Sequence, residues 1–198
     1  MKIGDKEYKR KTKEKIILAA EGLFARFGLN KTTVDEIAKI SHVAKGTIYH
    51  YFQSKEEIFE EVIEKEAQYF NNILQKNLDD AETPLEKLRA YVITQSKCVK
   101  ELTNYYSALR DEYLSSYTFI EKIRKNNFEN QFHIIKSILE QGSQNKIFAV
   151  ADINLTASAI ITALKGLEYK WTIGEQLQDI EKNIDMLLNL LFRGIEVR

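Results

Sequence analysis

The stretch TVDEIAKISHVAKGTIYHYFQSK, residues 33–55, predicts two short helices joined by a tight turn, followed by the start of a third helix. Thr33 and Glu36 have the spacing of a capping box, in which two side chains satisfy backbone N–H groups at the start of a helix. The same spacing recurs at Ser54 and Glu57, where the third helix is expected to begin. Two crossed helices of this kind, the second polar on its exposed face, form a helix-turn-helix.

The second short helix, at about residues 45–52, has one apolar and one polar face. Ile48 and Phe52 lie four residues apart and are expected to point inward. The other face consists of small, polar or cationic residues, namely Lys45, Gly46, Thr47, Tyr49 and His50. Glycine near a helix start lets the backbone approach a partner closely, and the helix dipole there favours phosphate. We therefore expect the N-terminal end of this helix to face DNA.

The segments TVDEIA, VAKGTIYHYF and SKEEIF resemble the DNA-binding signature of the tetracycline-repressor (TetR) family. The resemblance covers about the first sixty residues. The chain departs from the family pattern at His42, where glycine is usual in the turn, and at Ala44, where serine is frequent. A non-glycine residue in a left-handed turn carries some strain, and loss of a serine cap costs about 1 kcal/mol. Neither departure removes a DNA-facing group.

The remaining periodic segments also predict helices, so the expected fold class is all-α. Residues 1–11 are expected to be a mobile basic arm, and Thr12 to cap a helix that Gly28 ends. Further helices are expected at about residues 54–78, 84–101, 104–114, 117–141, 152–172 and 177–193. The predicted domains are a three-helix helix-turn-helix DNA-binding head, residues 1–55, and a larger helical effector-binding and dimerisation body, residues 56–198.

Charge is distributed unevenly between these two parts. Residues 1–55 carry 12 Lys and Arg against 6 Asp and Glu, whereas the rest of the chain carries 17 against 23. A basic head on an acidic body is typical of a DNA-binding protein. The single cysteine, Cys98, cannot form an internal disulfide, and the first fifteen residues do not resemble a signal peptide. With no apolar run long enough to cross a membrane, we expect a cytoplasmic protein.

Specific roles in DNA binding follow from these positions. Lys45, Thr47 and His50 are candidates for contacts with bases or phosphates, and Tyr49 is expected to pack on the DNA backbone. Thr33 and Lys55 begin the flanking helices, where they are well placed to hold phosphates. A twofold dimer would present two such helices and would need a palindromic operator.

Residues 61–198 contain seven tyrosines, six phenylalanines and the only tryptophan. Tyrosine is a costly core residue because its hydroxyl needs a partner, so a pocket for an apolar or aromatic effector is expected. The candidate effector-binding residues are Tyr69, Tyr91, Tyr105, Tyr113, Phe132 and Trp171. Arg89, Arg110 and Arg124 leave room for an anionic group on the effector, and a flat cation is the competing ligand. Plain core packing remains the alternative for each aromatic residue. Effector binding that releases DNA is what the family resemblance implies.

The last two predicted helices are apolar around much of their circumference, which indicates contacts on more than one side. The family resemblance implies that they pair with their twofold mates as a four-helix bundle. The candidate dimer residues are Ala159, Ala163, Gly166, Ile184 and Leu188. The alternative is that both helices are simply the core of a monomer.

The sequence contains no positive sign of an enzyme. The three histidines have no partner at metal-ligand spacing, and no phosphate loop or nucleophile elbow is present. We expect no cofactor and no metal. Two other classes remain open: a regulator without a small-molecule effector, controlled by a protein partner, and a helical enzyme or carrier whose head is incidental.

Overall fold

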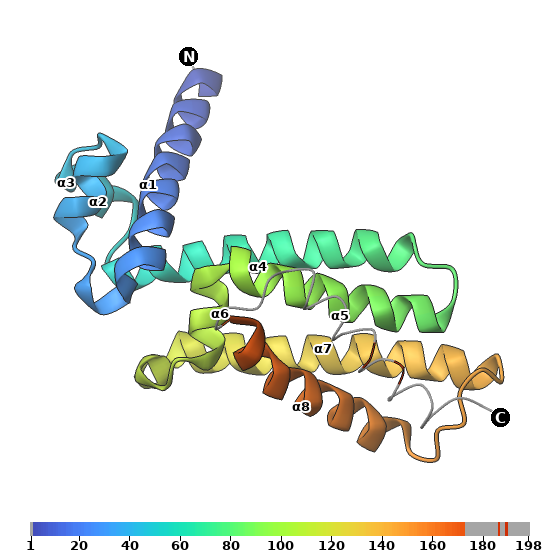
Figure 1. The fold of residues 1–198 in the computed structure, drawn as a ribbon. Helices are drawn as coiled ribbons and strands as arrows, with labels where there is room; N and C mark the ends of the chain where they lie inside the picture. Colours follow the sequence, from blue (N-terminus) through green and yellow to red (C-terminus); the bar gives the residue numbers. More distant parts are fainter. Residues whose placement is uncertain (1, 173–185, 187–188, 190–198) are drawn as a thin grey trace. The chain divides into compact units, whose positions relative to one another are not determined.

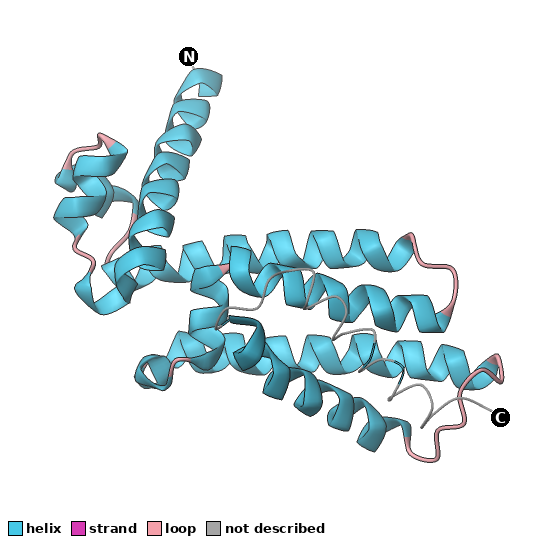
Figure 2. Ribbon diagram, viewed as in Figure 1, coloured by secondary structure: helices cyan, strands magenta, loops and turns pink. Residues whose placement is uncertain are grey.

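The computed structural model of this chain describes residues 2–172 together with Met186 and Asn189. Every regular element in this described part is helical, and no strand is drawn in Figure 2. The predicted all-α fold class is therefore confirmed. The helix expected at about residues 177–193, with the candidate dimer residues Ile184 and Leu188, lies outside the described residues.

The chain divides into two compact units whose boundaries are discontinuous in sequence. The first contains Met1–Gln68 and Thr103–Glu112, and the second contains Tyr69–Leu102 and Tyr113–Arg198. A helical segment from the middle of the chain therefore belongs to the same unit as the helix-turn-helix. The expected division into a DNA-binding head, residues 1–55, and an effector-binding body, residues 56–198, assigns functions to the two parts and stays a prediction.

The first unit contains α1 (Lys2–Lys31), α2 (Val34–Ser41), α3 (Lys45–Tyr51), the first half of α4 (Lys55–Asp79) and α6 (Thr103–Arg110) (Figure 1). Helix α1 packs against α2 and α6, and α2 packs against α3. The core side chains are aliphatic or aromatic and nearly inaccessible, and they include Ile16, Ala20, Phe24, Ile37, Ile48, Phe52, Ile58, Phe59 and Val62. Phe24 and Phe59 meet edge to face, with ring centroids 5.0 Å apart, in the arrangement that aromatic pairs favour.

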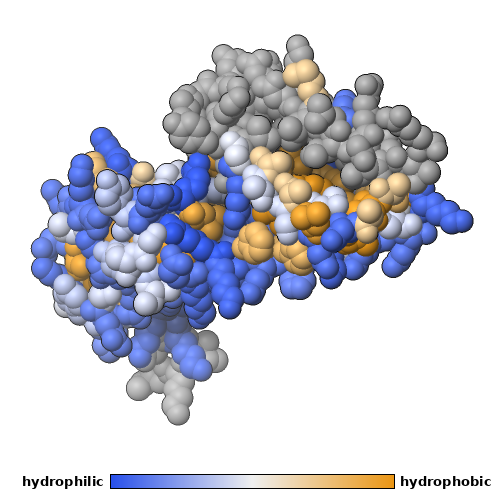
Figure 3. All heavy atoms as spheres, turned by 90° about the horizontal axis from the view of Figure 1, so that it is seen from below, coloured by the Kyte–Doolittle hydropathy of each residue, from blue (hydrophilic) through white to orange (hydrophobic). Residues whose placement is uncertain are grey.

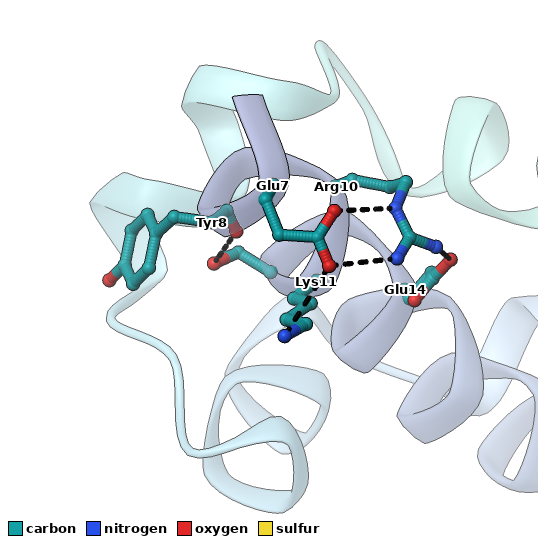
Figure 4. Close-up of polar contacts among 6 residues, drawn as sticks. Glu7, Tyr8, Arg10, Lys11 and Glu14 are labelled. Carbon is teal, nitrogen blue, oxygen red and sulfur yellow. Dashed lines mark hydrogen bonds and ion pairs between the residues drawn. The ribbon is translucent and has the colours of Figure 1, made fainter. Parts of the chain in front are cut away.

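Helix α1 begins at Lys2, so the expectation of a mobile arm over residues 1–11 is wrong. Arg10 lies between two carboxylates, 3.1 Å from Glu7 and 2.6 Å from Glu14, and Lys11 lies 3.4 Å from Glu7 (Figure 4). Opposite charges three and four residues apart support a helix, and this pattern continues the helix through the basic segment. Thr12 is inside the helix rather than at its cap, and its hydroxyl donates to the Tyr8 carbonyl at 2.9 Å.

Gly28 interrupts α1 as expected, because its φ of 76° lies in the left-handed region that favours glycine. One further helical turn follows before Lys31. Thr32 secures this turn, since its hydroxyl donates to the Gly28 carbonyl at 2.8 Å. Phe27, the residue before this interruption, is 44% exposed.

The second unit contains the rest of α4, α5 (Pro84–Glu101), most of the 3₁₀ helix η1 (Glu112–Ser116), α7 (Thr118–Gln144) and α8 (Ile153–Thr172). Helices α5, α7 and α8 pack against one another. The expected starts of α5 and α8 are confirmed: Thr83 forms a capping box with Glu86 ahead of Pro84, and the Asp152 carboxylate accepts the Leu155 N–H at 2.9 Å. Helix α7 continues to Gln144, past the end expected at about residue 141. The ring of Phe148 packs where a side chain at Gly142 would lie.

Candidate nucleic-acid interface

The start of α2 is fixed by the capping box read from the sequence. The Glu36 N–H donates to the Thr33 hydroxyl oxygen at 3.3 Å, and the Glu36 carboxylate accepts from the Thr33 N–H at 2.8 Å. The hydroxyl of Thr33 also donates to this carboxylate, at 2.8 Å. The hydrogen bond from the Thr33 hydroxyl, and to a smaller extent that from the Thr33 N–H, hold the pKa of Glu36 below its ordinary value. Thr33 is exposed, so it is available to a phosphate, but its hydroxyl already has a partner within α2.

The turn between α2 and α3 has the left-handed conformation expected from the sequence. His42 adopts φ 54° and ψ 37°, and its N–H donates to the Ala38 carbonyl. Ser41 closes the preceding turn, because its hydroxyl donates to the Ile37 carbonyl at 2.7 Å. Ala44 stands at the N-cap of α3 without a side-chain hydrogen bond. The cost in stability expected from both departures stays a prediction.

Helix α3 is held by its apolar side and leaves the other side exposed. Ile48 is 1% exposed and Phe52 is 2% exposed. The five residues predicted to face DNA are all exposed, namely Lys45, Gly46, Thr47, Tyr49 and His50. A Cβ added at Gly46 would meet nothing within 4 Å. Nothing inside the protein therefore requires glycine at this position, and the close approach of DNA to its backbone stays a prediction. The contacts of these residues with DNA stay predictions.

Two lysines of this surface have partners within the protein. The Lys45 Nζ lies 2.9 Å from the Asp35 carboxylate on the first turn of α2. This hydrogen bond holds the pKa of Lys45 above its ordinary value. Lys55 begins α4 and is half-buried, and its Nζ donates to the Asn30 carbonyl at 3.5 Å. Asp35 was not predicted from the sequence as part of this surface, although it stands two positions after the predicted N-cap Thr33.

The candidate effector residues whose side chains are described differ in burial and do not all belong to one unit. Tyr105 belongs to the first unit and is buried, and Tyr91 is fully buried in the second. Tyr69 and Tyr113 are 51% and 85% exposed, Phe132 is half-buried, and the side chain of Trp171 lies outside the described part.

Two clefts lined by described residues contain none of these six. One, of about 380 Å³, lies between α1 and α4 in the first unit, and the other, of about 340 Å³, lies between α4 and α5 in the second. Of the three arginines expected at a rim, Arg89 lines the second cleft. Arg110 lies over the Tyr106 ring in the first unit, and Arg124 donates to Ser115 at 2.7 Å. The effector site stays a prediction.

A buried carboxylate that was not predicted from the sequence connects α4 to α6. Glu66 is 4% exposed and accepts the Tyr105 N–H at 2.8 Å and the Asn104 side-chain amide at 2.7 Å. The same amide donates to the Glu21 carbonyl on α1 at 3.2 Å. Burial raises the pKa of Glu66, although the hydrogen bonds from Tyr105 and Asn104 act in the opposite direction. The sequence contains one sign of this burial. Glu66 stands at the four-residue spacing of the apolar residues Val62, Phe70 and Leu74 and therefore on the same helix face.

The candidate dimer residues that are described lie on α8. Ala159, Ala163 and Gly166 are exposed, while Ile160 and Leu164 between them are buried. Leu155, one turn before Ala159, is 68% exposed. On the face seen in Figure 3, apolar residues gather on the second unit, whereas the first unit is mostly hydrophilic.

The Cys98 thiol is buried, and burial raises its pKa to about 11, which argues against a reactive thiolate. In the described part of the chain, no group of three or more His, Cys, Asp or Glu side chains could hold a metal ion. None of the helices described is long and apolar enough to span a membrane.

Comparison with known proteins agrees with this geometry. The family model for bacterial regulatory proteins of the tetR family matches residues 16–62, which include α2 and α3. The chain is 27% identical over 189 residues to the HTH-type transcriptional regulator QacR of Staphylococcus aureus, covering 89% of this chain and 96% of that protein. It is 29% identical over 199 residues to the fatty acid metabolism regulator protein of Bacillus subtilis, covering 94% and 97%. The crystal structure of a transcriptional regulator from Cytophaga hutchinsonii superposes with a TM-score of 0.76 at 27% identity, covering 93% and 98%.

The fold and the exposed face of α3 define a helix-turn-helix regulator of transcription that binds DNA. Its helix-turn-helix segment, residues 16–62, belongs to the tetR family of bacterial regulatory proteins.

Proposed function

We propose that this protein is a repressor that binds a palindromic operator as a homodimer and releases it on binding a lipophilic small molecule. The observation that carries the proposal is the exposed face of α3, where Lys45, Gly46, Thr47, Tyr49 and His50 project from a helix anchored by two buried apolar residues. A helix of this kind fits the major groove, where each base pair presents a distinct pattern of donors and acceptors.

In this proposal the flanking helix starts set the register on DNA. Thr33 and Lys55 contact phosphates, which position the protein without reading sequence. Lys45, Thr47 and His50 read base edges, and Tyr49, which is 50% exposed, packs against the sugar-phosphate backbone.

The exposed face of α8 supports the homodimer. Ala159, Ala163 and Gly166 are small, and small residues let two helix axes approach closely. With Leu155 they form a continuous exposed strip, spaced three and four residues apart, that a partner helix could cover. A twofold pair of α3 helices would then read two half-sites about one helical turn of DNA apart.

The lipophilic effector is supported by the side chains of the second unit and by one relative. Tyr91, Thr94, Gln95 and Gln131 carry polar groups and are buried in the second unit. Pockets for drug-sized ligands combine apolar walls with a few polar points. The Bacillus subtilis relative is a fatty acid metabolism regulator protein, which favours a long acyl chain with an anionic or thioester end over a flat cation.

Selection from a library of randomised DNA duplexes, followed by native mass spectrometry, tests the proposal. We expect the protein to enrich a palindrome, to bind it as two chains per duplex, and to leave it when a long-chain acyl thioester is added. Failure to enrich any sequence would overturn the assignment as a DNA reader. Enrichment without release by an acyl thioester or a lipophilic cation would instead support a regulator controlled by a protein partner.

A further inference from the structure

An acidic residue lies within the surface proposed to face DNA. Asp35 is the second residue of α2, and its carboxylate is 2.9 Å from the Nζ of Lys45, the first residue of α3. The two side chains are 70% and 49% exposed. The pair therefore stands in solvent on the reading side of the helix-turn-helix rather than inside its core.

The position of Asp35 is not explained by the capping of α2. Negative side chains are favourable in a first helical turn, but Glu36 already forms the capping box with Thr33. Among the described residues, the Asp35 carboxylate accepts from Lys45 and from no N–H of its own helix. On a surface that must approach phosphates, an additional negative charge weakens binding, and this cost opposes the benefit of Asp35 at the helix start.

We propose that Asp35 is a positioning residue that sets the specificity of DNA binding by holding Lys45 until a matching base edge replaces the carboxylate. The inference rests on the proposed function. On an arbitrary sequence, a phosphate must compete with Asp35 for the Lys45 ammonium and also repels the carboxylate. Non-specific binding, which depends on phosphate contacts, is therefore weakened.

On the right sequence both partners find better contacts. The ammonium of Lys45 donates to O6 and N7 of a guanine, while the Asp35 carboxylate accepts from the N4 amino group of a cytosine. The pair thus reads a guanine and a cytosine that lie next to each other in the major groove. Each operator half-site should carry this combination at the position facing the start of α3.

The alternative is that Asp35 acts only through its charge, since removal of any negative charge strengthens binding to DNA. The two explanations differ in their dependence on Lys45. If Asp35 works through Lys45, removing Lys45 abolishes the effect of Asp35. If Asp35 acts only through its charge, the effect survives.

The test uses the full-length protein with Asp35→Asn, Lys45→Gln and the double variant. Asp35→Glu retains the charge, and Glu64→Gln removes one exposed charge from α4 of the same unit. Binding is followed by fluorescence anisotropy, over a series of salt concentrations, on the duplex enriched by the wild-type protein and on a scrambled duplex of the same composition. Circular dichroism checks that each variant is folded.

We expect Asp35→Asn to tighten binding to the scrambled duplex by about 3- to 10-fold at low salt and to steepen its salt dependence by about 0.9. Binding to the enriched duplex should not tighten, so the ratio of the two affinities falls. Asp35→Glu should restore the ratio, and the double variant should match Lys45→Gln alone.

The inference is overturned if Asp35→Asn leaves the ratio and the salt dependence unchanged, if its effect persists without Lys45, or if Glu64→Gln has the same effect. A wild-type protein that enriches no sequence would overturn the proposed function itself. If the wild-type protein enriches a sequence but Asp35→Asn has the same affinity ratio and salt dependence as the wild type, only this inference is overturned.

Discussion

At the scale of single residues, a substitution at Gly46 is expected to have opposite effects on stability and on DNA binding. The free protein leaves open space where its side chain would be. Gly46→Ala should therefore raise the free energy of unfolding, by a few tenths to about 1 kcal/mol, because alanine loses less conformational entropy in a helix. The same methyl group should weaken operator binding by obstructing the approach of the backbone to DNA. Thermal unfolding and a band-shift titration measure the two effects.

Gly22 supplies a matched control for this experiment. It is an exposed helical glycine of α1, and a Cβ there also meets nothing within 4 Å. Gly22→Ala should stabilise the protein to a similar extent and leave DNA binding unchanged. Equal losses of DNA affinity in the two variants would remove Gly46 from the interface.

Lys55 is expected to behave as a phosphate contact. Lys55→Ala should weaken binding to every duplex by a similar factor and reduce the salt dependence by about one unit. Because its Nζ also donates to the Asn30 carbonyl, a small loss of stability should accompany the change. Selective weakening on one sequence would mean that Lys55 reads bases.

At the scale of the helices, Glu66 holds the start of α6 against α4. Glu66→Ala would leave the Tyr105 N–H and the Asn104 amide buried without this acceptor, which costs about 1–3 kcal/mol. Chemical denaturation should show this loss of stability. Hydrogen exchange should show it first at the amides of α6, and unaltered exchange there would contradict the role.

The raised pKa of Glu66 also makes a prediction about pH. A carboxyl group with a folded-state pKa above its unfolded value binds its proton more tightly in the folded protein. Its contribution to stability is therefore lost as pH rises from about 4.5 through the folded-state pKa. We expect the wild-type protein to lose stability relative to Glu66→Gln over that interval. A constant difference between the two proteins from pH 4 to pH 8 would contradict the pKa direction.

Local signals explain which elements could be predicted from the sequence. Thr33, Thr83 and Asp152 begin helices through contacts with residues three positions away, so short-range spacing was enough to find them. Glu66 meets Asn104 and Tyr105 across almost forty residues of sequence, and no local pattern reveals such a partner.

Errors in the predicted elements have similarly physical causes. The first eleven residues were expected to be mobile because basic residues dominate their composition, whereas the alternation of Glu7, Arg10 and Glu14 favours a helix. For the candidate site, the sequence predicted which side of α3 is exposed. It did not show that Asp35 already binds Lys45, because that contact joins two helices across a turn.

At the scale of the whole molecule, the proposed dimer depends on the exposed strip of α8. Gly166→Leu should disrupt close packing between two helices and shift the protein from dimer toward monomer, at a cost of about 1–3 kcal/mol or more. Operator binding should weaken with it, because two heads on one operator require two joined chains. Sedimentation at several concentrations measures the shift.

Ala25→Leu, at an exposed position of α1, is the control for an added apolar side chain. It should leave the oligomeric state unchanged. A wild-type protein that is monomeric at all concentrations would contradict the proposed dimer. If Gly166→Leu dimerises as strongly as the wild type, the dimer contact lies elsewhere.

The membership of α6 in the first unit has a consequence for building chimaeras. A graft that joins residues 1–55 to the body of another regulator would leave behind residues 56–68 of α4 and all of α6, although both complete the unit that contains the helix-turn-helix. Glu21 and Lys13 would lose their partners on α4 and α6. Such a hybrid should fold poorly unless its first piece extends to Gln68 and it carries Thr103–Glu112 as a second insert from the same parent. In this protein, DNA specificity is therefore exchanged by transplanting two separate pieces of chain together.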